Sequence, residues 1–154
     1  MTVQLRPMTP AEVEVFVAAS YASYVTERIE AGEDREEAER VVHEQRAATF
    51  PGGVPAPGHR LYRVVDDGQA VGSLWLGPGP GGTPGLWWVW EVRIDEEHRG
   101  RGVGTAVMVL AEDEARATGA TELGLNVFGH NSGARRLYER LGYSTVAMRM
   151  AKRL

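Results

Sequence analysis

The chain has 154 residues, of which 43% are hydrophobic and 25% are charged, and its formal net charge at pH 7 is −4. This length and composition fit one ordinary globular domain with a substantial core. The acidic balance argues against a sequence-independent nucleic-acid binder, because such proteins are usually basic. The lack of cysteine excludes disulfides, a thiolate nucleophile and cysteine-ligated zinc.

The sequence also lacks the signals of membrane insertion and export. No apolar run approaches the ~18 residues of a membrane span, and the first residues lack the apolar core of a signal peptide. We therefore expect a single domain over residues 1–154, a cytoplasmic location, and no nucleic-acid or membrane partner.

The first third of the chain predicts one strand and two helices. The strand covers residues 3–7 and ends at a proline. The segment Thr9–Glu12 combines an N-cap, a first-turn proline and the acid of a capping box, so a helix starts here and extends to about residue 29. Asp34 is a candidate N-cap for a second helix over residues 35–49.

The middle of the chain predicts a hairpin. Residues 50–59 are rich in proline and glycine and predict a loop. Strands over residues 61–66 and 69–76 flank Asp67 and Gly68, a dipeptide that strongly favours a two-residue hairpin turn.

A third strand follows after a glycine-rich loop. Residues 77–85 contain five glycines and three prolines. The segment is too short to be a domain linker, so this composition predicts a long, mobile hairpin loop. Residues 86–94 are rich in aromatic and β-branched side chains and predict a strand antiparallel to its predecessor.

The next loop alternates glycine and arginine and leads into a helical pattern that extends from Val103 to about residue 118. The alternating residues are Arg99, Gly100, Arg101, Gly102 and Gly104. The first N–H groups of a helix lack intrahelical partners and carry the positive end of the helix dipole. Glycines let the backbone approach a ligand closely, and arginines add charge-assisted hydrogen bonds. This arrangement favours a phosphate or a pyrophosphate, and the alternative is a plain turn with solvated arginines.

The spacing narrows the choice of ligand. A P-loop needs Gly-Lys-Ser/Thr, and no lysine lies here; the dinucleotide fingerprint would need its third glycine at Val103 or Val107. The segment instead fits Arg-x-x-Gly-x-Gly, and in this it resembles the GNAT superfamily of acyl-CoA-dependent N-acetyltransferases. In that family this loop holds the pyrophosphate of coenzyme A. The resemblance therefore implies acetyl-CoA as cosubstrate and the following loop contacts: Arg99, Gly100, Arg101, Gly102, Val103, Gly104 and Thr105.

The pattern in the last third of the chain predicts a β-α-β crossover, followed by a helix and a final strand. Gly119 suits the position just after a helix, and a strand over residues 122–128 must then be parallel to the strand before the helix. A helix over residues 131–141 and a final strand over residues 143–152 complete the chain.

A second motif lies in this region. The helix starting at Asn131 ends in Leu-Tyr-Glu-Arg-Leu-Gly-Tyr, which resembles the GNAT pattern of an asparagine, an alanine three residues on, and a closing Leu-Tyr-Glu-x-Leu-Gly-Tyr/Phe. The resemblance implies that Asn131 reaches the pantetheine arm and that Tyr138 points at the cofactor sulfur. From the residues alone, Asn131 also fits a plain helix cap and Tyr138 a half-buried core tyrosine.

The predicted element order is β-α-α-β-β-β-α-β-α-β, which is an α+β (mixed α/β) fold. It matches the GNAT fold, with a central mixed, mostly antiparallel sheet, one β-α-β crossover, and helices on both faces. In that family the two strands around the crossover splay apart, and the cofactor lies in the gap.

The resemblance implies acetyl transfer to an amine. The amine must be neutral to attack, and a lysine-like amine has a pKa of about 10.4, so it must lose a proton. The thioester oxyanion needs a donor; the family uses a backbone N–H at a β-bulge, which places the cofactor-facing backbone at Val92, Arg93 and Ile94. A thiol has a pKa of about 8.5, so the leaving thiolate takes up a proton, and Tyr138 is the candidate to donate that proton or at least to stabilise the thiolate by a hydrogen bond.

The general base is less defined by the resemblance. Some members carry a glutamate five positions before the motif asparagine, where this chain has Asn126, which cannot act as a base. Glu91 is our candidate. Two alternatives are that Glu91 only pairs with Arg93 and that a water chain removes the proton. His130 borders the site as a bystander, and no metal is expected, because the histidines lack metal-ligand spacing.

We therefore predict an N-acetyltransferase that moves an acetyl group from acetyl-CoA to a primary amine of a small molecule or peptide, by direct attack in a ternary complex. The alternative is a non-catalytic coenzyme A-binding sensor or regulatory module. The sequence does not name the acceptor. A homodimer is expected because dimers are common among relatives.

Overall fold

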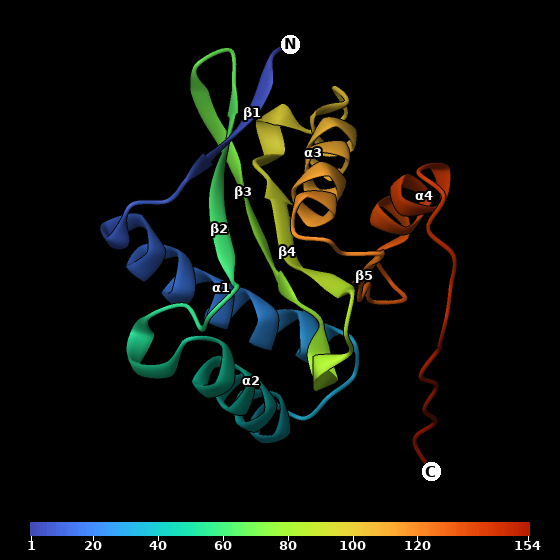
Figure 1. Cartoon of the computed structure of the whole chain (residues 1–154). Helices are drawn as coiled ribbons and strands as arrows, with labels where there is room; N and C mark the ends of the chain where they lie inside the picture. Colours follow the sequence, from blue (N-terminus) through green and yellow to red (C-terminus); the bar gives the residue numbers. More distant parts are fainter.

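The computed structural model describes residues 1–154 and contains a five-stranded sheet with helices on both faces (Figure 1). The strands are β1 Val3–Pro7, β2 Arg60–Asp66, β3 Gln69–Pro78, β4 Leu86–Ile94 and β5 Glu122–Leu125. The helices are α1 Pro10–Glu30, α2 Arg35–Thr49, α3 Val103–Ala117 and α4 Ser132–Arg140.

The sheet has the order β1-β2-β3-β4-β5. The first three pairings are antiparallel, whereas β5 is parallel to β4 because α3 connects them. The predicted mixed α+β fold with one crossover is thus confirmed. No helix has the length and apolar character that crossing a bilayer requires.

The capping signals fix where α1 and α2 start. The Thr9 hydroxyl accepts from the Glu12 backbone N–H at 3.3 Å, and the Glu12 carboxylate accepts from the Thr9 N–H at 2.9 Å. The Asp34 carboxylate accepts from the Glu37 N–H in the same way. These bonds satisfy N–H groups that have no acceptor within the helix, so both helices begin at the predicted residues.

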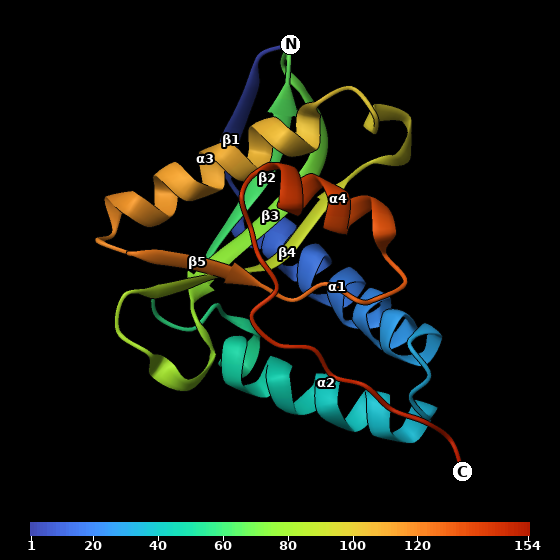
Figure 2. The same ribbon diagram turned by 90° about the vertical axis from the view of Figure 1, so that its right-hand side faces the viewer.

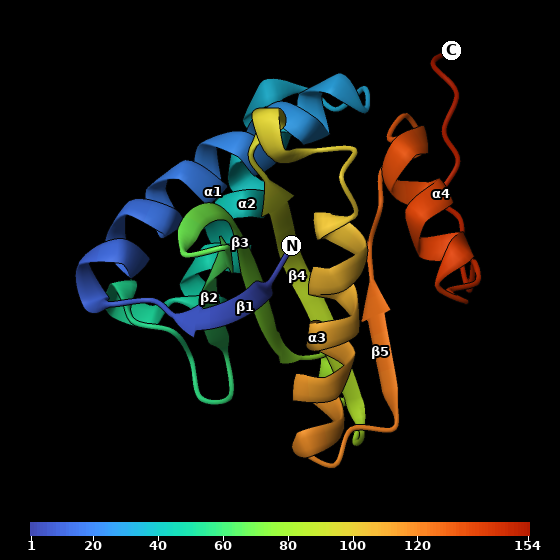
Figure 3. The same ribbon diagram turned by 90° about the horizontal axis from the view of Figure 1, so that it is seen from above.

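Two apolar clusters lie on opposite faces of the sheet. Because side chains alternate along a strand, Val64 and Leu74 pack with α3, whereas Leu61 and Trp75 pack with Phe16 of α1. Figure 3 shows the matching arrangement, with α1 and α2 on one side of the sheet and α3 on the other. Leu74 and Trp75 are at most 1% exposed, and full burial of a large apolar side chain contributes about 1.5–3 kcal/mol.

Two predicted strands differ from the structure. β5 ends at Leu125 rather than at residue 128, because the chain leaves β4 there. The predicted final strand over residues 143–152 is wrong, since no backbone N–H beyond Tyr143 donates a hydrogen bond. The residues alternate as in a strand, but the segment runs past α2 to the α1–α2 turn (Figure 2) and has no strand edge beside it.

Candidate active site

The candidate site starts where β4 and β5 separate. Their pairing begins at Leu86 with Glu122 and stops at Val89 with Leu125, so the rest of β4 has no strand on this side. At the same point the register between β3 and β4 shifts, which leaves Trp90 as an extra residue in β4. Such a bulge increases the local twist of a strand. The splay and the bulge expected from the family resemblance are therefore both present.

The free edge of β4 presents backbone groups beyond this bulge. The Asp95 N–H donates to the Val71 carbonyl of β3 at 2.9 Å, whereas the Ile94 carbonyl accepts from the Arg99 side chain at 2.7 Å. Alternate residues of a strand direct their N–H and C=O groups to opposite edges. The backbone groups of Val92 and Ile94 therefore point away from β3 and into the separation between the strands. Those of Arg93 point toward β3, so Arg93 can contribute only its side chain.

The N-terminus of α3 lies directly after this edge. Its N-cap is Gly102, with φ of 85°, and the first intrahelical bond runs from the Ala106 N–H to the Gly102 carbonyl at 3.1 Å. The N–H groups of Val103, Gly104 and Thr105 come before that bond, and no side chain caps them. Unsatisfied N–H groups at the positive end of a helix dipole form an anion site. Gly102 is needed because its positive φ is unfavourable for other residues.

The two loop arginines have different contacts. The Arg99 Nε is bonded to the Ile94 carbonyl, so this side chain ties the loop to the end of β4. Arg101 is exposed and forms neither an ion pair nor a side-chain hydrogen bond. Arg101 is thus the loop cation that is free to meet a ligand, while Arg99 holds the loop in shape. Gly100, with φ of 72°, makes the turn between them.

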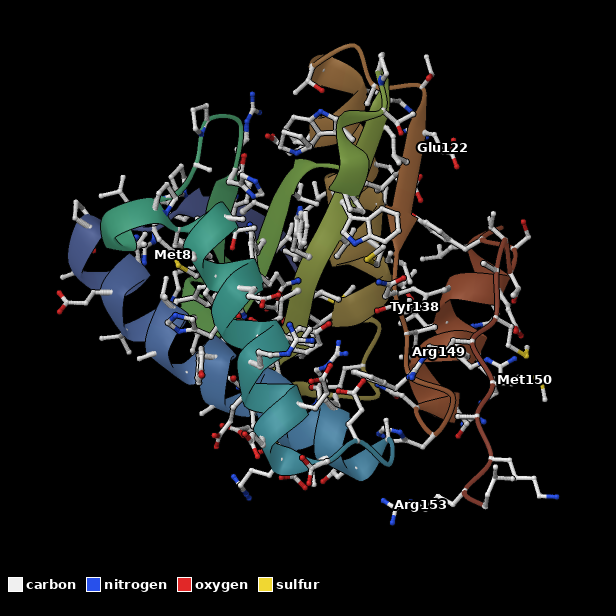
Figure 4. All side chains as sticks on the ribbon, turned by 90° about the horizontal axis from the view of Figure 1, so that it is seen from below. Met8, Glu122, Tyr138, Arg149, Met150 and Arg153 are labelled. Atoms are coloured by element: carbon white, nitrogen blue, oxygen red, sulfur yellow. The ribbon has the colours of Figure 1, made fainter.

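α4 brings Tyr138 close to the start of α3. A side-chain carbon at Gly104 would lie 3.2 Å from the Leu137 Cδ1, so the two helices meet closely at that glycine. Tyr138 is half-buried, its hydroxyl has no hydrogen-bond partner, and burial raises its pKa. Its ring packs edge-on against Tyr143 at 6.0 Å, and Figure 4 shows it on the side of α4 that faces the sheet. This phenol is therefore protonated at neutral pH and available to a ligand.

Asn131 occupies the N-cap position of α4. Its side-chain oxygen accepts from the Ala134 backbone N–H at 3.3 Å, which is the plain helix cap considered above. The side-chain NH₂ group of Asn131 makes no hydrogen bond. The cap and a contact to a ligand are compatible, since they use different atoms of the amide.

Glu91 and Arg93 project from β4 toward α1. The Arg93 Nη2 lies 3.7 Å from the Glu91 Oε1, and the Glu91 side chain is 18% exposed. Arg93 also donates to the hydroxyl of Ser23 on α1. Burial raises the pKa of Glu91, although Arg93, Ser20 and the more distant Arg46 act in the opposite direction. Both Glu91 and Arg93 line a groove of about 380 Å³ between α1 and the sheet.

Arg46 is a buried residue near Glu91 that no sequence motif indicated. This α2 residue is 8% exposed, donates to the hydroxyl of Ser20, and lies 4.8 Å from the ring centre of Trp75; its Nε has no partner. It brings a buried positive charge into the surroundings of Glu91. A signal was present, because Ala38, Val42 and Arg46 recur at four-residue spacing and share one face of α2.

Two further side chains in this region, Glu27 and Phe128, were not identified from local patterns. Burial and the charge of Glu91 raise the pKa of Glu27 on α1. Phe128, after β5, stacks on His130 with 5.7 Å between the ring centres, and its ring centre lies 6.2 Å from that of Tyr24 on α1. The His130 ring lies 3.8 Å from Glu30. No contact joins His130 to Glu91, so the two do not form an acid–base pair.

The fold and the relatives of the chain define an N-acetyltransferase. The chain is similar to YycN of Bacillus subtilis (strain 168), named as an uncharacterized N-acetyltransferase, with 28% identity over 100% of both chains. The crystal structure of YycN superimposes with a TM-score of 0.88 over 99% of each chain. YdgE of the same organism, also named as an uncharacterized N-acetyltransferase, is 30% identical over 100% of this chain and 99% of its own.

Residues 18–143 match the model of the Acetyltransferase (GNAT) family, so the chain belongs to that family. A shorter stretch, 57% of this chain, is 37% identical to the mycothiol acetyltransferase of Beutenbergia cavernae and covers 29% of that protein. The protein is therefore an enzyme of the acyltransferase class, as the sequence motifs indicated.

Proposed function

We propose that this enzyme transfers an acetyl group from acetyl-CoA to a primary amine of a small molecule or peptide, by direct attack within a ternary complex. One observation carries the proposal: the free edge of β4 runs directly into an uncapped helix N-terminus. The first element offers hydrogen bonds to an extended amide-containing arm, and the second offers them to a pyrophosphate. A molecule that joins these two groups is coenzyme A.

The residues present fit this cosubstrate. The N–H groups of Val103, Gly104 and Thr105 would hold the pyrophosphate, with Arg101 adding a charge-assisted hydrogen bond. The backbone of Val92 and Ile94 would bond the pantetheine arm along the open edge of β4, and the free amide group of Asn131 would reach the same arm. The N–H groups at the helix start have no other acceptor, so binding satisfies donors that the fold leaves free.

Glu91 is suited to the role of general base. It faces the groove beside α1, and its raised pKa makes its carboxylate a better proton acceptor than an exposed glutamate. The attacking nitrogen forms a bond to the acetyl carbon, and its proton passes to Glu91 directly or through a water. A β4 N–H stabilises the oxyanion that develops on the carbonyl.

Tyr138 is suited to the role of general acid. When the C–S bond breaks, the thiolate takes the phenol proton, and the product thiol leaves with the amide product. Because burial raises the pKa of Tyr138, the phenol carries that proton throughout the neutral range. Solvent restores the proton afterwards, so no other reactant is required.

The test is an assay of acetyl-CoA cleavage with a panel of amines. The panel contains polyamines, amino acids, aminoglycosides and peptides with free N-termini, and thiol release is followed by a thiol reagent. The chain has no cysteine of its own, so the protein adds no background. We expect amine-dependent thiol release with at least one class, together with the acetylated amine by mass spectrometry.

The alternative, a non-catalytic coenzyme A-binding module, predicts a different result. It requires acetyl-CoA binding without amine-dependent thiol release, and equal behaviour of the wild type and Tyr138→Phe. An amine that is acetylated only by the wild type would exclude it.

A further inference from the structure

A row of polar side chains crosses the face of the sheet that α1 covers (Figure 3). The register places Arg63 of β2 directly opposite Ser73 of β3, and Ser73 directly opposite Arg93 of β4. Side chains that stand opposite each other on neighbouring strands point to the same face of a sheet. All three line the groove of about 380 Å³ that also contains Glu91. The groove therefore has a row of hydrogen-bond donors across it, and the two arginines carry a permanent positive charge.

Small side chains leave this groove open. α1 contacts the sheet through Phe16, which packs with Leu61 and Trp75. On the groove side of this contact, α1 contributes Ala19 and the sheet contributes Ser73. Both side chains are too short to fill the space between helix and sheet. The groove thus gives a ligand access to the polar row beneath α1.

The charge of Arg63 is not used by the fold. Its Nε is buried and has no hydrogen-bond partner. The Glu12 carboxylate lies 3.9 Å from this Nε, which is too far for a hydrogen bond. Glu12 instead accepts from the Arg6 side chain at 2.7 Å and from the Thr9 N–H at 2.9 Å. A buried donor without an acceptor is unfavourable, so Arg63 is available to an acceptor group that the chain itself does not supply.

Ser73 provides a second free donor beside Arg63. It is 6% exposed, and its hydroxyl makes no hydrogen bond within the chain. The Cβ atoms of directly opposite residues are about 4.5–5.5 Å apart, so both side chains can reach one ligand group. A guanidinium matches the two oxygens of a carboxylate. A phosphate would bring a second negative charge toward Glu91 and Asp95, which line the same groove, so a carboxylate is the favoured group.

We infer that this groove binds the acceptor, and that the acceptor is a small amino carboxylate, such as an amino acid, whose carboxylate lies on Arg63 and Ser73. This inference rests on the proposed function, because the amine of the acceptor must reach Glu91. Glu91 stands opposite Trp75, two residues along β3 from Ser73. Such diagonal positions are about 7–8 Å apart, and a molecule of amino-acid length spans that distance.

The first experiment compares matched pairs of acceptors in the thiol-release assay with the full chain. Each pair contains an unbranched amino acid with a terminal amine and the alkylamine that lacks only the carboxylate, and the pairs increase in length. At the best length we expect the amino acid to have the higher kcat/KM by about 10- to 100-fold, the factor that one hydrogen bond to a charged group contributes. Equal kcat/KM in every pair would overturn the inference and leave the proposed function intact.

Two variants test the contact to the carboxylate. Arg63→Met keeps an unbranched side chain without the charge, and it should remove the advantage of the amino acid over its alkylamine. Ser73→Ala should remove a smaller part, about fivefold, because the hydroxyl is an uncharged donor. The matched control is Arg60→Met on the same strand, where the arginine pairs with Glu114 of α3 at 3.1 Å, and it should keep the wild-type ratio. An unchanged ratio in a folded Arg63→Met would overturn the inference, and the wild-type pairs remain a test if that variant does not fold.

Calorimetry separates this inference from the proposed function. Each amino acid of the series is titrated into the wild type and into Arg63→Met in the presence of coenzyme A. We expect binding that is at least tenfold weaker in the variant, a result that does not depend on turnover. If no amine gave thiol release but this difference remained, the proposed function would fail and the groove would still be an amino carboxylate site. No thiol release and no binding to the wild type would overturn both.

Discussion

The two halves of the candidate site are built in different ways. The proposed cofactor half, residues 92–105, is made mainly of backbone groups: the open edge of β4 and the uncapped start of α3. The proposed acceptor half is made of side chains from separate elements, such as Glu91 of β4 and Arg46 of α2, next to α1. The cofactor half therefore depends on backbone conformation, and the acceptor half depends on burial and charge. Substitutions should affect them in different measurable ways.

The largest expected effect is on cofactor affinity. Gly102→Val places a β-branched residue at φ of 85° and moves the first turn of α3. Hydrogen bonds to a charged group contribute about 1.5–3 kcal/mol each, so loss of one or two should weaken coenzyme A binding by about 100-fold in calorimetry. The matched control is Gly119→Val at the other end of the helix, with φ of 87°. Equal weakening in both variants would show that general strain, rather than the anion site, is responsible.

The next effect separates turnover from binding. Tyr138→Phe removes the phenol proton and should lower kcat by about 100-fold, within the range for a general acid, while the Kd of acetyl-CoA stays within about twofold because the ring remains. The control is Tyr143→Phe, whose hydroxyl bonds Glu112. That variant should lose stability, by about 1 kcal/mol, and keep its turnover. Wild-type turnover in Tyr138→Phe would remove the tyrosine from the mechanism.

A smaller effect, about tenfold in kcat/KM, is expected for Glu91→Gln, because a water can partly replace the base. In the wild type kcat/KM should rise with pH as Glu91 loses its proton. Since burial raises its pKa, this rise should lie above the usual glutamate value of about 4.3. The variant should lack this limb of the pH profile.

Stability gives an independent check on Glu91. A carboxyl group with a raised pKa in the folded state stabilises the protein most at low pH, and that contribution is lost as the pH rises through the folded pKa. The neutral amide avoids this loss, so Glu91→Gln should unfold at a higher denaturant concentration than the wild type at neutral pH. A variant that is both less active and less stable would indicate that Glu91 only holds Arg93 in place.

The smallest expected effect is a shift of the same pH profile. The buried charge of Arg46 lowers the pKa of Glu91, so Arg46→Met should move the acid limb to higher pH. The control is Arg40→Met on the exposed face of α2, where the arginine pairs with Glu37 and Glu44. The control should leave the limb in place. If the acid limb of the Arg46→Met profile were unchanged, Arg46 would have no influence on the pKa of Glu91 and would not belong to the acceptor half.

The same contrast explains what the sequence could predict. The caps at Thr9 and Asp34 and the glycines around α3 act on neighbouring residues, so local spacing located them. The hydrogen bond between Arg46 and Ser20 joins residues 26 positions apart, and that between Arg93 and Ser23 joins residues 70 apart. No local pattern encodes such contacts, because they depend on how α1, α2 and β4 pack together.

The segment after Tyr143 shows a different limit. Its alternation correctly marks a sequence that can form a strand, but a strand also needs an edge, and the edge is a property of the assembled fold. The length of β5 is limited in the same way, since its pairing ends where β4 turns away at the bulge.

The proposed function depends on acetyl-CoA binding at the open edge of β4 and the start of α3. The most direct test is thermal unfolding in the presence of acetyl-CoA, with ATP and NAD as control ligands. A specific ligand at about 100 times its Kd adds about 2.7 kcal/mol to the free energy of unfolding, so a clear rise in Tm with acetyl-CoA, absent in Gly102→Val, is the expected result. No rise in Tm with a folded wild type would contradict acetyl-CoA binding at this site.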